Sequence, residues 1–86
     1  MLKLLIVDDN KQITSILEEY AKKEGYQTLI AFDGEQAMDL FEKEKPDIVL
    51  LDVMMPKKDG FAVCREIRRT SNVPIIMITA RGQDFE

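Results

Sequence analysis

The sequence contains no histidine, no tryptophan and a single cysteine, Cys64. Without histidine, a Ser-His-Asp triad and most histidine-based acid–base mechanisms are excluded. Cysteine–histidine zinc sites are excluded for the same reason, and one cysteine cannot form a disulfide within the chain. We interpret Cys64 as a small packing residue. Any chemistry must therefore come from carboxylates, hydroxyls and backbone groups.

The chain also has no long hydrophobic run and no excess of positive charge. No apolar stretch reaches the roughly 18–20 residues of a membrane span, and the apolar segment at its start is too short for the core of a signal peptide. We therefore expect no membrane association and a cytoplasmic location. With 16 acidic and 12 basic residues the net charge is −4, which predicts no direct binding to nucleic acid. A chain of 86 residues is long enough for one small domain.

Short, continuous apolar runs recur along the chain. Such runs are typical of strands that are covered on both faces, as in a parallel sheet. A weaker run at residues 28–31 predicts a further strand at an edge of the sheet. The strong runs occupy residues 4–7, 48–51 and 75–78.

Between these runs the apolar residues follow helical spacing, which predicts three helices. Asp9 or Asn10 can cap the first helix, Gly25 can end it, and Asp33 and Asp59 can cap the other two. The apolar positions are Ile13, Ile16, Leu17 and Tyr20 in the first helix, Ala37, Leu40 and Phe41 in the second, and Phe61, Val63, Cys64 and Ile67 in the third.

The order strand-helix-strand-helix-strand-helix-strand predicts an α/β fold with a parallel sheet. Right-handed crossovers then place helices on both faces of the sheet. Residues 79–86 resemble a loop and the first residues of another helix, so the sequence stops where a further element is expected to begin.

Polar side chains directly follow three of the predicted strands. Asp8 and Asp9 follow the first run, Asp52 follows the run at 48–51, and Thr79 follows the run at 75–78. Because parallel strands end at one edge of a sheet, these residues should meet where doubly wound sheets bind ligands. Each feature alone is common as a helix cap or loop residue. Their joint occurrence at three strand ends favours a functional site.

Three closely packed carboxylates repel one another unless some are protonated or a cation lies among them. Oxygen ligands favour a hard divalent ion, and Mg²⁺ is the ion that commonly joins carboxylates to phosphate. Asp8, Asp9 and Asp52 are therefore predicted metal ligands, with the backbone carbonyl of Met54 within reach. Asp52 is the predicted nucleophile for phosphoryl transfer. Thr79 is placed to donate its hydroxyl to a phosphoryl oxygen.

Four segments resemble the receiver domains of bacterial two-component response regulators, in the same order and at the same spacing. The resemblance covers essentially the whole chain and implies a flavodoxin-like sheet with strand order 2-1-3-4-5, of which this chain carries the first four strands. The segments around residues 54–56 and 64–68 look most like the winged-helix transcription-factor subfamily. The four matching segments are Leu5-Ile6-Val7-Asp8-Asp9, residues 48–56 with Leu51-Asp52-Val53-Met54-Met55-Pro56 at their end, Asp59-Gly60, and residues 73–80 with Met77-Ile78-Thr79-Ala80 at their end.

The resemblance also implies residue roles. Asp52 accepts a phosphoryl group from a sensor histidine kinase, Asp9 binds Mg²⁺ directly, and Asp8 acts partly through water. Met54 gives its carbonyl to the ion, and Thr79 matches the switch hydroxyl that moves toward the phosphoryl group. The implied protein is a signalling module, not an enzyme that turns over substrate. Its parent is implied to be a transcription regulator whose DNA-binding effector domain is controlled by phosphorylation.

Receiver domains continue through a further helix, strand and helix. We therefore expect residues 1–86 to form a receiver domain that is shortened at its C-terminal end. The family's lysine that pairs with the phosphoryl group belongs to that further strand, so the chain as given is expected to be weak or inactive as a switch. The run at 73–79 is then an open sheet edge, which predicts self-association.

Two other interpretations remain open. An aspartyl-nucleophile phosphohydrolase typically has a second acid two residues after the nucleophile, and Met54 occupies that position here. A half-domain with a purely structural role is the other alternative. A small-molecule binder of the flavodoxin type is disfavoured, because the sequence has no glycine-rich phosphate loop.

Overall fold

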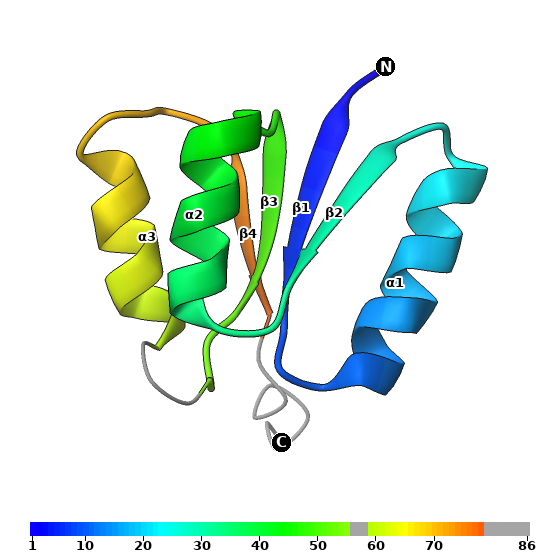
Figure 1. Cartoon of the computed structure of the whole chain (residues 1–86), viewed down its shortest axis with the longest axis horizontal. Helices are drawn as coiled ribbons and strands as arrows, with labels where there is room; N and C mark the ends of the chain where they lie inside the picture. The colour runs from blue at the N-terminus through cyan, green and yellow to red at the C-terminus, as the bar shows by residue number, and fades with distance from the viewer. Residues whose placement is uncertain (56–58, 79–86) are drawn as a thin grey trace, which may run out of the picture.

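The computed structural model describes residues 1–55 and 59–78, which form a four-stranded sheet flanked by three helices (Figure 1). The predicted alternation of strands and helices is confirmed. Asp52 is the last residue of its strand instead of the first residue after it. The strands are β1 (Lys3–Val7), β2 (Gln27–Ala31), β3 (Ile48–Asp52) and β4 (Ile75–Ile78), and the helices are α1 (Lys11–Lys23), α2 (Gly34–Glu44) and α3 (Gly60–Arg68).

The sheet has the strand order β2-β1-β3-β4, and every neighbouring pair is parallel. This is the first part of the flavodoxin-like order, as expected, and the weak strand β2 lies at an edge. Val7 at the end of β1 lies beside Leu51, and Asp52 lies beside Ile78. The carboxyl ends of the three adjacent strands β1, β3 and β4 therefore meet at one edge, at the lower end of the sheet in Figure 1.

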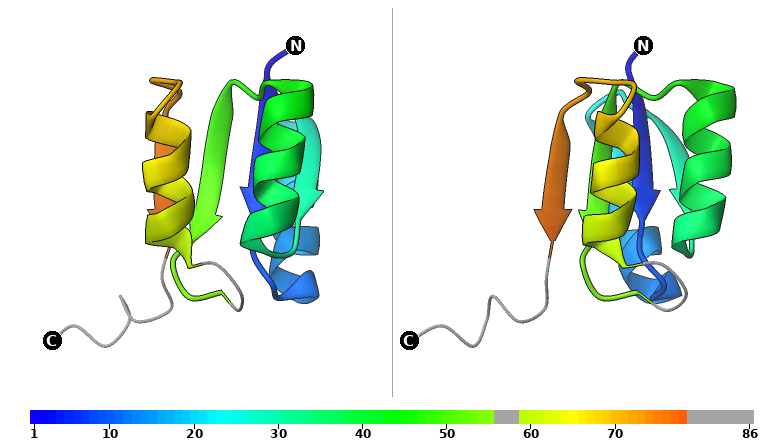
Figure 2. Two further views of the ribbon diagram at one scale, coloured as in Figure 1. Left: turned by 60° about the vertical axis from the view of Figure 1, so that its left-hand side comes forward. Right: turned by 90° about the vertical axis from the view of Figure 1, so that its left-hand side faces the viewer.

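The helices divide between the two faces of the sheet. Helices α2 and α3 lie together over one face and α1 lies alone over the other (Figures 1 and 2). Because side chains alternate along a strand, Leu5 and Val7 enter the core beneath α2 and α3, whereas Leu4 and Ile6 face α1. Among the described residues, no helix is both long enough and apolar enough to cross a membrane.

The predicted buried face of α1 is wrong. Thr14 and Ala21 are buried and Leu17 is partly buried. The face of α1 that packs on the sheet is therefore displaced by about one residue along the sequence from the predicted face. Small side chains at positions 14 and 21 let the helix approach β1 and β2 closely. Leu17 is part of both the predicted face and the observed buried face, so the apolar spacing alone could not show which of the two faces the sheet. The other three residues of the predicted face are exposed: Ile13 (41%), Ile16 (52%) and Tyr20 (65%).

Two further burial predictions need correction. Val63 and Ile67 of α3 are completely buried and Cys64 packs against the same core, but Phe61 is 54% exposed. The apolar run of β4 is typical of a strand covered on both faces, yet Ile76 is 54% exposed, which agrees with the open sheet edge expected at residues 73–79. The reason is that α1 contacts β1 and β2, which leaves the α1 face of β4 uncovered among the described residues.

The helix caps select between the alternatives that the sequence left open. The Asn10 side chain accepts hydrogen bonds from the backbone N–H groups of Gln12 (2.9 Å) and Ile13 (3.2 Å), so Asn10, and not Asp9, caps α1. Asp33 and Asp59 cap α2 and α3 as predicted. Capping therefore does not require the carboxylate of Asp9.

Candidate functional site

The first two carboxylates of the site follow the central strand β1. Asp8 is only 5% exposed, and its backbone N–H donates to the carbonyl of Ala31 at 3.1 Å. Its carboxylate accepts a hydrogen bond from the N–H of Asn10 at 2.9 Å, which fixes the turn into α1. Asp9 is exposed on the same turn. One carboxylate is thus held in place by backbone contacts, and its neighbour is free to reach a ligand.

The third carboxylate ends the adjacent strand β3. Asp52 is partly buried and pairs with Ile78 of β4. Its Oδ1 accepts a hydrogen bond from the N–H of Met54 at 3.2 Å. The next peptide is held as well, because the N–H of Val53 donates to the carbonyl of Ile78 at 2.9 Å. The position of Asp52 therefore depends on both β3 and β4.

Asp8, Asp9 and Asp52 converge as the strand order predicts. One carboxylate oxygen from each lies within 4.8 Å of the other two. The pKa of Asp52 is raised above its usual value of 3.8, chiefly by burial and further by the negative charges of Asp8 and Asp9. The hydrogen bond from Met54 acts in the opposite direction and lowers this pKa. The site thus concentrates negative charge around a partly desolvated carboxylate.

The donor set suits a hard divalent cation. In an octahedral Mg²⁺ site with ligand distances of about 2.1 Å, adjacent ligand oxygens lie about 3 Å apart and opposite ones about 4.2 Å apart. The limit of 4.8 Å between the oxygens of the three aspartates is close to these separations, so the group fits such an ion. The group of potential ligands found among the described residues consists of three aspartates and includes neither a cysteine nor a histidine.

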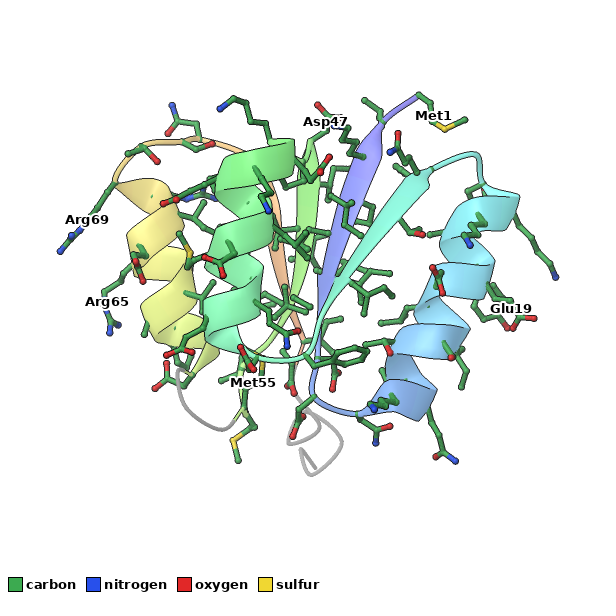
Figure 3. The ribbon with its side chains drawn as sticks, in the orientation of Figure 1. Met1, Glu19, Asp47, Met55, Arg65 and Arg69 are labelled. Atoms are coloured by element: carbon green, nitrogen blue, oxygen red, sulfur yellow. The ribbon has the colours of Figure 1, made fainter. Side chains whose placement is uncertain are left out.

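The remaining predicted site residues lie near or beyond the described part of the chain. The side chain of Met54 is 52% exposed, and its N–H contacts Asp52. Met55 lies at the same end of the sheet in Figure 3, opposite the end that carries Asp47 and Met1. Thr79 lies outside the described residues, so its predicted role stays a prediction.

The sequence interpretation overlooked the contribution of Gly60, the first residue of α3. Gly60 is buried, and its N–H donates to the carbonyl of Val53 at 3.0 Å. The sequence signal was weak, because a glycine directly after a helix cap occurs both at Asp59-Gly60 and at Asp33-Gly34. The sequence could not reveal that the neighbour of Gly60 is the backbone of Asp52.

The comparison with known families decides the identity of this fold and site. The family described as the response regulator receiver domain matches residues 4–86. This chain belongs to that family. It is the receiver domain of a two-component response regulator, and receiver domains are phospho-acceptor signalling modules. They typically bind Mg²⁺ through a cluster of aspartates, and in this chain Asp8, Asp9 and Asp52 form a group of three aspartates that could hold a metal ion.

Solved receiver domains have the same architecture. The receiver domain of the Francisella response regulator 1452 is 32% identical, with a TM-score of 0.87 over 93% of this chain and 67% of that chain. A receiver domain from Methanoculleus marisnigri JR1 is 31% identical, with a TM-score of 0.88 over 93% and 68% of the two chains. The BeF3-activated receiver domain of Klebsiella pneumoniae RstA is 33% identical, with a TM-score of 0.87 over 91% and 67%. This chain thus spans about two thirds of the length of these relatives.

Proposed function

We propose that Asp52 is the phosphoryl acceptor of this receiver domain. In the transfer, a carboxylate oxygen of Asp52 forms a bond to phosphorus while the bond between phosphorus and the histidine nitrogen of the donor kinase breaks. The electron pair of the broken bond returns to the histidine nitrogen. The observation that carries this proposal is the convergence of Asp8, Asp9 and Asp52, with Asp52 held at a strand end by Met54.

The residues proposed to hold Mg²⁺ are Asp8, Asp9, Asp52 and the backbone carbonyl of Met54. Bound Mg²⁺ supplies positive charge that offsets the carboxylates and the incoming phosphoryl oxygens. Asp8 is the buried, hydrogen-bonded member of the group and orients the turn. Asp9 is exposed, which suits a ligand that contacts the ion directly. Thr79 completes the proposal as the hydroxyl that binds a phosphoryl oxygen.

A receiver domain implies a histidine kinase as phosphoryl donor and an effector domain as the recipient of the signal. We propose a DNA-binding effector of the winged-helix type, on the resemblance of residues 54–56 and 64–68 to that subfamily, and a cytoplasmic location. We also propose that this chain self-associates through β4. In the described residues β4 pairs with β3 on one side only, and its Ile76 is 54% exposed.

Incubation with acetyl phosphate and Mg²⁺, followed by intact-mass measurement, tests the phosphoryl-acceptor proposal. The expected result is a partial mass gain of one phosphoryl group in the natural sequence and in Asp39→Asn, because the chain is expected to be a weak switch, and no mass gain in Asp52→Asn. Asp39 is a matched control because it is an exposed aspartate on α2. Equal labelling of Asp52→Asn, or no labelling of any variant, contradicts the proposal for this chain.

A further inference from the structure

The backbone of Val53, the residue after Asp52, is hydrogen-bonded to two elements. The N–H of Val53 donates to the carbonyl of Ile78 at the end of β4, at 2.9 Å. The carbonyl of Val53 accepts from the N–H of Gly60 at the start of α3, at 3.0 Å. Residue Val53, through the peptide groups on either side of its Cα, therefore links β4, β3 and α3 directly behind the proposed phosphoryl acceptor. The start of α3 is part of the support of the site although none of its side chains belongs to the carboxylate group.

The contact between α3 and this peptide requires glycine for reasons of space. A Cβ atom on Gly60 would lie 2.7 Å from the Cα of Val53 and 3.0 Å from the carbonyl carbon of Asp52, and still closer to the carbonyl oxygen of Asp52. All three of these atoms belong to the backbone, so no side-chain rotation relieves the overlap. Among the described glycines only Gly25 has a positive φ, at 92°. The constraint at Gly60 is therefore steric and does not concern backbone dihedral freedom.

We propose that Gly60 is a positioning residue for the Mg²⁺ and phosphoryl-acceptor site, acting through the backbone of Asp52 and Val53. A methyl group at position 60 must push α3 away from this backbone or push the Asp52–Val53 peptide out of place. The second movement shifts the carboxylate of Asp52 and disturbs its hydrogen bond from Met54. Mg²⁺ tolerates little deviation from octahedral geometry, so such a shift weakens metal binding.

This inference rests on the proposed function, and its test pairs two glycine-to-alanine substitutions. Gly60→Ala adds a methyl group against the site. Gly25→Ala adds one where no atom lies within 4 Å, and there the cost comes from the positive φ. Gly25 precedes β2 and so lies at the end of the sheet away from the carboxylates. Both variants are expected to lose stability. Only Gly60→Ala is expected to lose Mg²⁺ affinity in calorimetric titration, by about 10- to 100-fold, as for other changes behind a metal ligand.

The outcomes separate the inference from the proposed function. If the natural sequence binds no Mg²⁺, the proposed function fails. If the natural sequence binds Mg²⁺ and Gly60→Ala binds it equally well, or Gly25→Ala loses as much affinity, the positioning role is overturned.

A second measurement does not depend on the folding of Gly60→Ala. In a Mg²⁺ titration of the natural sequence followed by NMR, the amide of Gly60 should shift along the same saturation curve as the amides of Asp52 and Met54. The amide of Gly25 should stay constant. A Gly60 amide that ignores Mg²⁺ while that of Asp52 responds would overturn the inference.

Discussion

Replacing Asp52 with asparagine should make the metal-free protein more stable. The substitution removes one of three negative charges whose oxygens lie within 4.8 Å of one another. At that distance two carboxylates repel by about 0.9 kcal/mol in a water-like dielectric and by about 3.5 kcal/mol at an effective dielectric constant of about 20. Asp9 is exposed and solvent screens its charge. We therefore expect Asp52→Asn to raise the free energy of unfolding by about 1–2 kcal/mol, closer to the value for a water-like dielectric than to the value for a dielectric constant of about 20. Asparagine keeps an oxygen that can accept the hydrogen bond from Met54.

The gain should depend on pH in a defined direction. The pKa of Asp52 is raised in the folded protein above 3.8, first by burial and then by Asp8 and Asp9. The folded state therefore binds the proton of Asp52 more tightly than the unfolded state does. This contribution to stability is complete below the unfolded pKa and is lost as the pH rises through the folded pKa. The advantage of Asp52→Asn should accordingly be small near pH 4 and reach its full value above the raised pKa of Asp52.

Urea unfolding followed by circular dichroism, in EDTA and at several pH values, measures this gain. The matched control Asp39→Asn, at an exposed position on α2, should change the free energy of unfolding by no more than about 0.5 kcal/mol. Saturating Mg²⁺ should reverse the order. At a concentration 100 times its Kd it adds about 2.7 kcal/mol to the natural sequence, and less to Asp52→Asn. An Asp52→Asn variant that is no more stable than the natural sequence in EDTA at neutral pH would refute the charge-repulsion argument.

Two further predictions concern the edge of the sheet and the core. Sedimentation velocity at tens of micromolar should show self-association that Ile76→Lys abolishes, because a charge on the exposed face of β4 opposes pairing of that edge, whereas Ile16→Lys on α1 should leave it unchanged. A strictly monomeric natural sequence, or loss of association only in Ile16→Lys, would contradict this. Ile67→Ala should cost about 2–5 kcal/mol in thermal or urea unfolding because Ile67 is completely buried, while Ile16→Ala, at a side chain 52% exposed, should cost less than about 1 kcal/mol. Similar costs for the two substitutions would mean that the burial pattern described for α1 is wrong.

The sequence predicted the parts of this fold that depend on local pattern. Uninterrupted apolar runs such as that ending at Val7 identify buried parallel strands, and polar residues such as Asp8 and Asp52 mark where those strands end. Once the strands are parallel, the meeting of these carboxylates at one edge follows from geometry. The helix caps Asp33 and Asp59 were also predictable, because capping depends on residues that are near in sequence.

The features that the sequence missed depend on contacts between distant segments. The buried face of α1 is set by how closely Thr14 and Ala21 allow the helix to approach the sheet, and apolar spacing does not contain that information. The exposure of Ile76 depends on which strands α1 covers. The role inferred for Gly60 depends on the proximity of α3 to the backbone of Asp52, and the raised pKa of Asp52 depends on its burial.

The most direct test of the central claim is to locate the phosphoryl group. After reaction with acetyl phosphate and Mg²⁺, borohydride reduction converts an aspartyl phosphate to homoserine, which peptide mass spectrometry assigns to a residue. The proposed site predicts homoserine at position 52 alone, and its loss when EDTA removes the metal. Homoserine at position 8 or 9, or labelling at position 52 that is indifferent to EDTA, would contradict the account of Asp52 as a metal-dependent phosphoryl acceptor.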